Sequence, residues 1–294
     1  MVKEEFVMKV GLINIEPKIV NTAYMQISQY HKQKGDLVEW WTPLEHRQFD
    51  VVYCSSLFDF TPKRDIPSNV ICGGTGFDIN SKLPEDIENY DYDYSPYPEC
   101  DYSIVWFSRG CIRNCSFCCV RQKEGDIRPV DPKPLNQKGK YIVVQDNNFF
   151  ANPEWESAIE LLLEYNQPVA FQGVDVRELT ILKCRALNSL KLYSQIKIAW
   201  DNPKQNLIKD FNLMLEFIKP YKIACYVLIG FNSTKKEDLY RVETLRELKI
   251  DPFVMPYNKK DPYQKAFARW VNHKAIFKTV KWEDYKQNSM LVCA

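Results

Sequence analysis

The sequence predicts an α/β fold in which parallel strands alternate with helices. Three observations lead to this prediction. Short apolar runs rich in Val, Ile and Leu recur along the chain, and turn residues bound most of them, as is typical of strands. Longer runs with helical character lie between most of these strands. Polar or glycine-containing segments follow several strands, and sheets of this class bind ligands at that edge.

The first part of the chain carries four predicted strands and one predicted helix. The strands are expected at residues 7–14, 38–41, 49–54 and 68–72, and the helix at residues 22–34. A glycine cluster, Gly73, Gly74 and Gly76, follows the last strand. It is weak support for a phosphate-binding loop, because a tight turn leaving a strand needs glycine without any ligand.

A segment rich in tyrosine and proline separates the two parts of the chain. Residues 84–102 contain three prolines and five tyrosines, a composition typical of an irregular linker. We therefore expect a first domain at residues 1–83, a linker at 84–101, a second domain at 102–258 and a helical extension at 259–294.

The second part repeats the alternation of strands and helices. Strands are expected at 103–108, 140–145, 168–172, 195–200, 222–229 and 252–256, and helices at 153–165, 177–190, 204–218 and 234–248. Asn152 and Pro153 resemble a cap followed by an N1 proline, and Thr234 with Glu237 forms a predicted capping box. Six βα-type units predict a partial barrel and not a closed eight-fold one.

The bulk composition is that of a globular protein. The 294 residues are 45% hydrophobic and 26% charged, without a signal-peptide core or a membrane-spanning apolar run. Ten cysteines without a secretory signal favour a reducing compartment, so we expect a cytoplasmic protein with no membrane partner. The net charge of +1 divides into about −7 for residues 1–100 and about +8 for the rest.

Cys111, Cys115 and Cys118 form the most informative motif, C-x3-C-x2-C with Phe117 before the last cysteine. Three thiolates on one loop can hold three irons of a [4Fe–4S] cluster and leave the fourth iron open. Cys119 is adjacent to Cys118, and successive side chains alternate in direction in an extended chain. A zinc site is the alternative, but structural zinc usually takes two separated ligand pairs, and the other cysteines are scattered singly.

This motif resembles the signature of the radical S-adenosylmethionine (radical SAM) enzymes. The resemblance implies that S-adenosylmethionine chelates the open iron and is cleaved reductively to methionine and a 5′-deoxyadenosyl radical. It also implies a TIM-type partial barrel whose cluster loop follows its first strand, with Phe117 beside the adenine. A flavodoxin- or ferredoxin-like protein is the implied electron donor.

The first part of the chain resembles the Rossmann-like, cobalamin-binding-type domain that precedes the barrel in one class of these enzymes. Two features differ from that pattern. The D-x-H-x-x-G motif that ligates cobalamin is absent, and the domain is truncated after Gly76. We therefore do not expect it to bind cobalamin.

Polar residues follow three of the later strands, where barrels of this kind place their chemistry. Asp146 and Asn147 lie where the family orients the methionine amine; an Asx turn is the alternative. Arg177 could hold the methionine carboxylate by its planar fork, unless it simply pairs with Asp175. Asp201 lies where related enzymes place an acid on the ribose or amine, and helix capping is an equal alternative.

The last two strands add weaker candidates for the cofactor site. Gly230 would let the backbone approach the adenosine, as a family glycine does, although close packing also explains it; Asn232 follows in the same motif. Met255 could face the adenine. The residue that exchanges a proton or hydrogen with substrate is unknown. Cys119 and Cys225 are candidates for it, with buried inert thiols as the alternative.

The stretch after residue 258 interleaves basic and aromatic residues. Its members are Lys259, Lys260, Lys265, Arg269, Lys274, Lys278 and Lys281 with Tyr263, Phe267, Trp270, Phe277 and Trp282. Such a composition can bind nucleic acid, but Phe267 and Trp270 share a helical face, and we favour packing against the barrel.

The sequence thus predicts a radical SAM enzyme that generates a radical for hydrogen abstraction from an unidentified substrate. Within that class, a cobalamin-dependent methyltransferase and an enzyme that modifies nucleic acids or nucleotides are alternatives. A non-catalytic iron–sulfur or zinc module, serving as redox sensor or scaffold, is the alternative of another class.

Overall fold

The computed structural model describes residues 7–285, which divide into two compact units. Within these residues, the first unit comprises 7–104, 118–125 and 132–140, and the second comprises 105–117, 126–131 and 141–285. Both contain parallel strands and helices, so the predicted α/β class is confirmed. None of the helices in this part of the chain is long and apolar enough to cross a membrane.

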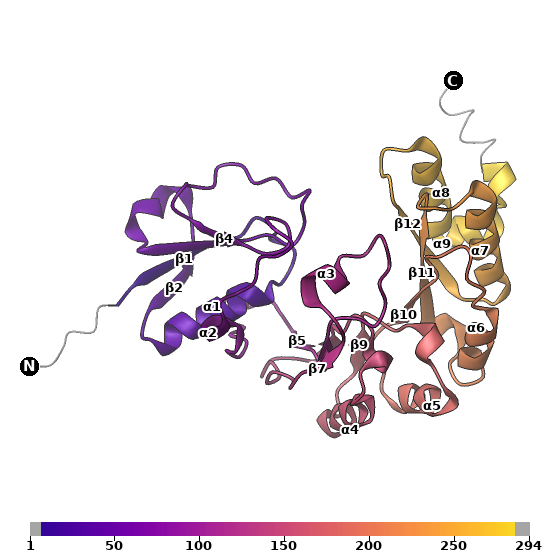
Figure 1. Ribbon diagram of the computed structural model, residues 1–294, viewed down its shortest axis with the longest axis horizontal. Helices are drawn as coiled ribbons and strands as arrows, with labels where there is room; N and C mark the ends of the chain where they lie inside the picture. The colour runs from indigo at the N-terminus through magenta and orange to yellow at the C-terminus, as the bar shows by residue number, and fades with distance from the viewer. Residues whose placement is uncertain (1–6, 286–294) are drawn as a thin grey trace, which may run out of the picture. The chain divides into compact units, whose positions relative to one another are not determined.

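The first unit is built on a four-stranded parallel sheet. Its elements are β1 (Lys9–Ile13), α1 (Thr22–Gln33), β2 (Leu37–Trp40), the 3-10 turn η1 (Pro43–Gln48), β3 (Val51–Ser55) and β4 (Ile71–Gly73). The strand order is β2-β1-β3-β4, and every neighbouring pair is parallel. Figure 1 shows α1 on one side of this sheet. All four strands and the helix lie within two or three residues of the positions predicted from the sequence.

Tyr24 connects α1 to the two central strands of this sheet. Its side chain is 1% exposed and packs with Leu12 and Ile27. Its hydroxyl donates to the carbonyl of Ile13, lies 3.1 Å from the carbonyl oxygen of Ser55 and accepts from the Ser55 N–H at 2.6 Å. A buried hydroxyl needs such partners, so this contact fixes how α1 sits against β1 and β3.

The segment predicted to be an irregular linker is partly ordered by packing. It contains a helical turn, α2 (Glu85–Glu88), whose Ile87 joins the core beneath α1. Tyr97 packs against the same core, and its hydroxyl accepts from the Asn21 N–H at 3.1 Å. Tyr97, which the composition assigned to a linker, therefore packs against the core of the first unit.

The second unit carries the remaining strands, as two parallel three-stranded sheets and one antiparallel pair. The strands are β5 (Tyr102–Val105, at the boundary of the units), β6 (Ser108–Arg109), β7 (Arg128–Pro129), β8 (Tyr141–Val144), β9 (Val169–Phe171), β10 (Ile196–Ala199), β11 (Ile223–Ile229) and β12 (Asp251–Pro256). The sheets have the orders β5-β8-β9 and β10-β11-β12, and β6 pairs with β7. The six predicted strands are present, although the first one divides into β5 and β6.

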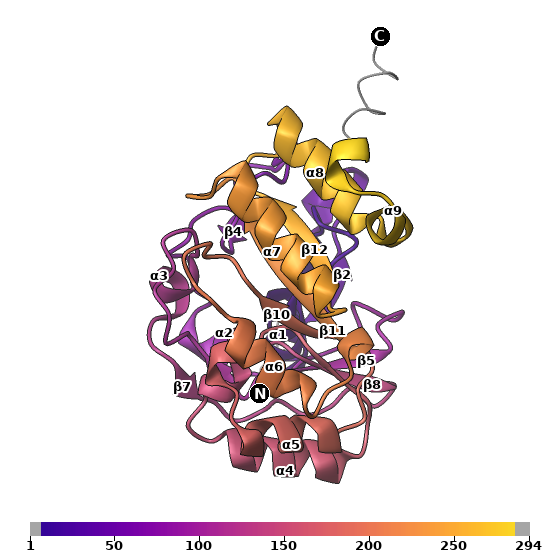
Figure 2. The same cartoon turned by 90° about the vertical axis from the view of Figure 1, so that its right-hand side faces the viewer.

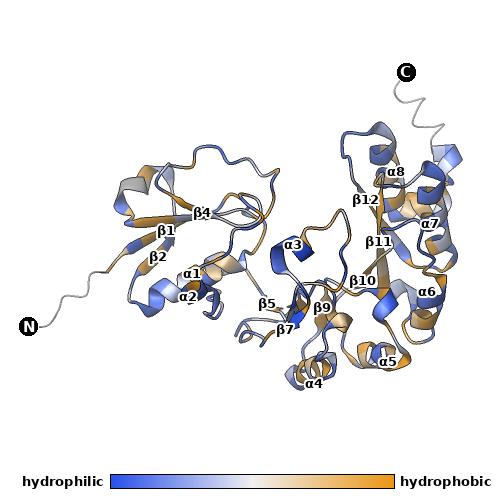
Figure 3. Ribbon diagram, in the orientation of Figure 1, coloured by the Kyte–Doolittle hydropathy of each residue, from blue (hydrophilic) through white to orange (hydrophobic). Residues whose placement is uncertain are grey.

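Helices alternate with these strands as predicted. They are α3 (Val120–Glu124, grouped with the first unit), α4 (Trp155–Tyr165), α5 (Ile181–Ser189), α6 (Ile208–Leu215), α7 (Lys235–Glu247), α8 (Pro262–Asn272) and α9 (Lys274–Thr279), with 3-10 turns η2 (Phe149–Ala151), η3 (Val176–Glu178) and η4 (Pro220–Lys222). In Figure 3, β1 is among the hydrophobic segments and α3 is hydrophilic.

Helix capping agrees with the sequence at one position and differs at another. The capping box of Thr234 and Glu237 at the start of α7 is confirmed. The predicted cap of α4 by Asn152 is wrong, because the helix begins at Trp155. Asn152 instead donates to the carbonyl of Phe107 at 3.1 Å and accepts from the Glu154 N–H. Satisfying a buried carbonyl thus takes precedence over capping at this position.

The sheet β10-β11-β12 has one face covered by helices. Ile198, Cys225, Val227 and Val254 are buried on this face, and α7 packs against β11 and β12. Trp200, just beyond β10, contacts Phe211 of α6 at a ring-centroid distance of 5.4 Å. Figure 2 views the sheet through α6 and α7. The opposite face carries the alternate side chains of the same strands.

The aromatic residues of the C-terminal stretch form a packed cluster. Phe267 and Trp270 of α8 are fully buried, and both contact Trp282 at centroid distances of 5.0 and 5.3 Å. Asn272 of the same helix bonds in both directions with the backbone of Val254 in β12. The shared helical face predicted for Phe267 and Trp270 is therefore a packing face.

Candidate functional site

The cysteine loop begins directly after β6. Gly110 starts it with φ +82°, a conformation that glycine adopts without strain. Cys111 and Cys115 are half-buried and Cys118 is exposed. The N–H of Arg113 donates to the Cys111 sulfur at 3.4 Å. Among the described residues, no group of three or more His, Cys, Asp or Glu side chains is arranged to hold a metal ion; Cys293 lies outside them.

The Cys115 thiol lies in the electrostatic field of two strand ends. Burial raises its pKa; the guanidinium of Arg177 opposes this shift, and Cys111, Asp201 and Asp175 add to it. Asp175 and Arg177 follow β9, and Asp201 follows β10. The fold therefore brings together a cysteine of the loop and three of the charged residues selected from the sequence.

Asp175 is the centre of a cluster of four charged side chains. Its carboxylate accepts from Arg177 at 2.7 and 2.6 Å and from Nε of Arg113 at 2.9 Å. Arg113 also donates to Glu178. Burial would raise the pKa of Asp175, but the two guanidinium groups hold it below its ordinary value. The ion pair between Asp175 and Arg177 is thus present, and a residue of the cysteine loop shares it.

Asp201 is held by the neighbouring strand. Its carboxylate accepts from the Leu228 N–H at 3.0 Å. Burial raises the pKa of Asp201, although this N–H and the guanidinium groups of Arg241 and Arg177 oppose the shift. Arg241 itself is fully buried, where it pairs with Asp238 at 2.7 Å and donates to the Asp201 carbonyl at 3.1 Å. The carboxylate is therefore fixed in place at the end of β10.

Asp146 and Asn147 contact the backbone around the cysteine loop. Asp146 is 1% exposed and accepts from the Phe107 N–H at 2.9 Å and from the Ser108 hydroxyl. Burial raises its pKa to about 6. Asn147 donates to the Gly110 carbonyl at 3.4 Å. These side chains therefore brace the strand and turn that lead into the loop.

Gly173 permits the ends of β8 and β9 to meet. A Cβ at this position would lie 2.4 Å from the carbonyl oxygen of Asp146 and 2.5 Å from that of Asn147. Both distances are too short for real atoms, and backbone cannot move aside easily. Glycine is therefore required here by close approach of two backbones.

Asn148 presents an unsatisfied polar group in the segment that follows β8. Its side chain is 2% exposed, and neither its amide nitrogen nor its oxygen has a hydrogen-bond partner within residues 7–285. A buried amide without partners is unfavourable by roughly 1–3 kcal/mol. A ligand or a water molecule that reached this side chain would relieve that cost.

Gly230 is explained by packing within the protein. It has φ +74°, and a Cβ there would lie 2.2 to 2.5 Å from the amide group of Gln264. Gln264 is buried and accepts from the Asn258 N–H at 2.9 Å. Asn232, two residues on, is exposed with φ +52°. Close packing against Gln264 of α8 thus accounts for a glycine at position 230.

Three aromatic side chains extend from the cysteine loop across two strand ends. Phe117 contacts Phe231 edge-on at a centroid distance of 5.5 Å, and Phe231 contacts Tyr257 at 4.9 Å. Phe117 is 38% exposed and Tyr257 is 59% exposed. The rings are inclined to one another by 72° and 59°, so together they offer an apolar surface of ring edges and faces.

The remaining candidates are separated by their exposure. Cys225 is fully buried, and burial raises the pKa of its thiol well above its ordinary value. Cys119 is exposed beside Cys118. Met255 is half-buried on β12, where it lies opposite Leu228. A fully buried thiol with a raised pKa, such as that of Cys225, is suited to packing and not to nucleophilic attack.

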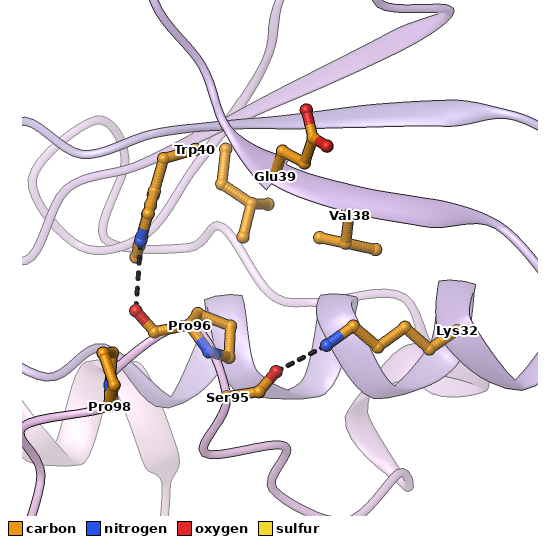
Figure 4. Close-up of a pocket in the computed structure, with 8 residues that line it drawn as sticks. Lys32, Val38, Glu39, Trp40, Ser95, Pro96 and Pro98 are labelled. Atoms are coloured by element: carbon orange, nitrogen blue, oxygen red, sulfur yellow. Dashed lines mark hydrogen bonds between the residues drawn. The ribbon is translucent and has the colours of Figure 1, made fainter.

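A separate hollow in the first unit has its polar groups already paired. It measures about 260 Å³ and lies among β2, α1 and the segment around Pro96. Figure 4 shows the Trp40 indole donating to the Pro96 carbonyl, at 3.0 Å, and Lys32 donating to Ser95. Lys32 also pairs with Asp93 at 2.7 Å. This hollow offers a ligand few free polar partners.

Several residues of the site were not selected from the sequence. Arg113 could have been noticed, since a guanidinium inside the motif is well placed to pair with an acid. Phe231 adjoins Gly230 and could have been noticed in the same way. Gln264 and Tyr257 carry no local signal, because their roles depend on how α8 and β12 pack.

No protein-family model matches this chain, and no curated protein matches it.

Proposed function

We propose that the chain is a radical SAM enzyme whose Cys111, Cys115 and Cys118 hold a [4Fe–4S] cluster. Thiolates are the ligands that this cluster takes, and three of them on one short loop would leave a fourth iron site free, although the described residues do not gather the three thiols around a common point. The loop also follows the first strand of the second unit, the order expected for this class. When bound, the cluster supplies the electron that cleaves S-adenosylmethionine to methionine and a 5′-deoxyadenosyl radical.

One observation carries the proposal. The Cys115 thiol shares its electrostatic environment with Arg177 and Asp175 after β9 and with Asp201 after β10. A purely structural zinc site would not need polar side chains from two strand ends beside it. A zwitterionic ligand such as the methionine end of S-adenosylmethionine needs both signs of charge.

The charged residues can divide the work of binding that end. Asp175 has two guanidinium partners, so it keeps Arg113 when Arg177 turns toward a carboxylate. Arg177 then holds the methionine carboxylate by its planar fork. Asp201, held by the Leu228 N–H, is placed to accept from an amine or a ribose hydroxyl. Asn148 is the buried amide that lacks partners without a ligand.

The aromatic residues suit the other end of the cofactor. Phe117, Phe231 and Tyr257 offer ring faces on which an adenine can stack. Met255 is less strongly supported for this role. For the hydrogen-transfer step we propose no residue, since Cys225 is buried and Cys119 has no contact that aims it at a ligand. A flavodoxin- or ferredoxin-like protein is the proposed electron donor.

The finer architecture belongs to the same proposal. Strands β5, β8 and β9 with β10, β11 and β12, all in chain order, support a TIM-type partial barrel with six strands. The order β2-β1-β3-β4 supports a Rossmann-like first domain.

We do not propose cobalamin as a ligand of this first domain. Glu16 occupies the edge between β1 and β3, where it accepts from the N–H groups of Leu57 and Phe58. A Cβ on Gly74 or Gly76 would collide with the backbone of Ser56 or Phe58. The glycine cluster is therefore explained by packing, without a phosphate.

The test is anaerobic reconstitution with iron and sulfide, followed by dithionite reduction with S-adenosylmethionine. We expect a [4Fe–4S] absorption and paramagnetic signature and the formation of 5′-deoxyadenosine. The variant with Cys111, Cys115 and Cys118 all changed to alanine should lose both. Cys119→Ala is the matched control and should retain the cluster signature.

Two outcomes would contradict the proposal. One is a protein that binds zinc tightly and cannot be loaded with iron. The other is a cluster that survives the triple substitution. Calorimetric titration of S-adenosylmethionine into the loaded protein tests cofactor binding independently of turnover, in case cleavage requires substrate.

A further inference from the structure

The face of the β10-β11-β12 sheet opposite the buried side chains of Ile198, Cys225 and Val254 carries a distinct set of side chains. Strand register places Lys197, Ala224 and Asp251 in one row across the sheet. Ala199, Tyr226 and Phe253 form the next row. Side chains in one row of a parallel sheet point to the same face. The two rows therefore form one continuous surface of mixed character.

A hollow of about 220 Å³ lies on this surface. Its lining includes both rows, apart from Ala199, and residues at the edge of the sheet such as Gln195 and Lys274. Pockets for drug-sized ligands occupy roughly 300–1,000 Å³. The hollow therefore suits a group with a single ring better than a nucleotide.

Two lysines line this hollow, and Lys197 is the one that lies within the sheet. It is half-buried and lies in the middle of a strand, where its ammonium donates to the Gln172 side-chain oxygen at 2.7 Å. Within the described part of the chain it makes no ion pair with a carboxylate. Burial lowers its pKa. A half-buried charge with only an amide as partner gains strongly from an anionic ligand.

The acid in the same row is already neutralised by other partners. Asp251 accepts from Lys274 at 2.6 Å and from the Gln195 amide at 2.8 Å. Burial would raise the pKa of Asp251, but these two donors hold it below its ordinary value. The negative charge of Asp251 is therefore balanced by Lys274. Lys197 remains the group to which an anionic ligand would bind.

The aromatic row supplies the second half of a recognition site. Tyr226 and Phe253 contact each other edge-on at a centroid distance of 5.5 Å, and Phe253 is 46% exposed. An exposed phenylalanine on a strand face, beside a tyrosine, is a favourable surface for a flat apolar group. The distance between neighbouring rows, about 7 Å, matches a ring that carries its anion directly or through a short link.

We propose that this surface binds the substrate, and that the substrate carries a carboxylate or phosphate beside a ring. The anion lies on Lys197 and the ring lies on Tyr226 and Phe253. The identification of the ligand as substrate rests on the proposed radical SAM function. Lys197 lies within β10 and Asp201 lies two residues beyond its end, so the ligand lies toward the start of the strand from the charged groups near Cys115.

The experiment measures ligand binding to the protein without a cluster, so that it does not depend on S-adenosylmethionine cleavage. Phenyl phosphate and 3-phenylpropionate are the two anionic probes, and benzyl alcohol is the neutral one. Calorimetry should detect both anions, with the neutral probe bound at least about tenfold more weakly. The stronger of the two anions identifies the phosphate or the carboxylate as the natural group.

Lys197→Met should weaken both anions about tenfold, because it retains the apolar stem and removes the charge. Phe253→Ala should weaken all three probes. Lys191→Met, at an exposed lysine of the same unit, is the matched control and should change nothing. The thermal midpoint of each variant reports whether it is folded.

Equal binding of anions by the wild type and Lys197→Met would overturn the inference, as would equal binding of benzyl alcohol and the anions. Failure of the wild type to bind either anion at millimolar concentration would also overturn it. None of these results bears on whether the reconstituted enzyme forms 5′-deoxyadenosine. Failure of that assay with intact anion binding would instead remove the proposed function alone.

Discussion

Arg113 and Asp175 connect the cysteine loop to the end of strand β9 through a hydrogen bond of 2.9 Å between guanidinium and carboxylate. The two residues are 62 positions apart in sequence. Arg113 lies between the first two cysteines, so the position of the loop depends on this contact. Its second donor, to Glu178, restricts the guanidinium further.

Arg113→Gln should therefore loosen the loop without unfolding the second unit. The pair is partly exposed, so we expect a loss of only about 1 kcal/mol in the free energy of unfolding. Iron uptake at limiting iron should fall more clearly, because the thiols are then held less well. Arg185→Gln, at an exposed position of α5, is the control. Equal iron uptake by the two variants would contradict a positioning role for Arg113.

The order of elements was predictable because strand and helix patterns are local. Apolar runs such as residues 223–229 can only be satisfied by burial, and they form β11 at almost the predicted bounds. The capping box of Thr234 and Glu237 was predictable for the same reason. The role of Asn152 could not be predicted in this way, because its side chain donates to the carbonyl of Phe107, which is distant in sequence.

The candidate site was predictable only in part, because most of its contacts join distant segments. Strand ends directed attention to Asp175, Arg177 and Asp201. Their closeness to Cys115 depends on how β9 and β10 follow the loop in space. Gly230 was selected for a ligand, but its neighbour is Gln264, from a helix whose docking no local pattern predicts.

Gly230→Ala should destabilise the second unit by about 2 kcal/mol. The φ of +74° is strained for alanine, and the Gln264 amide would have to move aside and lose its hydrogen bond from the Asn258 N–H. Gly35→Ala is the matched control, since Gly35 has φ +86° with no atom within 4 Å of the added Cβ. It should lose only about 1 kcal/mol from strain. Chemical denaturation measures both, and equal losses would show that the Gln264 contact is unimportant.

The thiols should differ sharply in reactivity in the reduced protein without a cluster. Cys118 and Cys119 are exposed, whereas Cys184 and Cys225 are fully buried, and burial raises the pKa values of the two buried thiols. Thiolate and access both govern alkylation. Iodoacetamide with mass spectrometry should label the first pair within minutes and spare the second. Rapid labelling of Cys225 would restore it as a candidate for hydrogen or proton transfer.

Asp146 should make stability depend on pH near 6. Its pKa is raised from 3.8 to about 6 by burial, so the folded state favours the protonated acid. Its favourable contribution is complete below pH 3.8 and is lost as the pH rises through 6. Asp146→Asn should therefore be more stable than the wild type above pH 6, by at most about 3 kcal/mol. Thermal unfolding between pH 4 and 8 tests this, and a variant that is less stable throughout would show that the Ser108 and Phe107 contacts require the carboxylate.

Glu16 should produce the opposite pH dependence in the first unit. Burial acts to raise its pKa, but hydrogen bonds from Thr61, Leu57, Phe58 and Ser56 together lower it from 4.5. The stabilisation is thus present above pH 4.5 and is lost as the pH falls through the lowered value. Glu16→Gln should reduce the thermal midpoint at pH 7. An NH2 group would replace one of the two carboxylate oxygens that accept hydrogen bonds, and this new donor would face N–H and O–H donors.

The difference between this variant and the wild type should shrink as the pH falls through the lowered pKa of Glu16, because both side chains are neutral below it. Glu39→Gln is the control, since Glu39 pairs only with Lys9 at 3.1 Å and is half exposed. A Glu16→Gln effect that persists unchanged at low pH would mean that shape and not charge matters at this edge. The negative charge of Glu16 would then not be what joins the turn after β1 to the turn after β3.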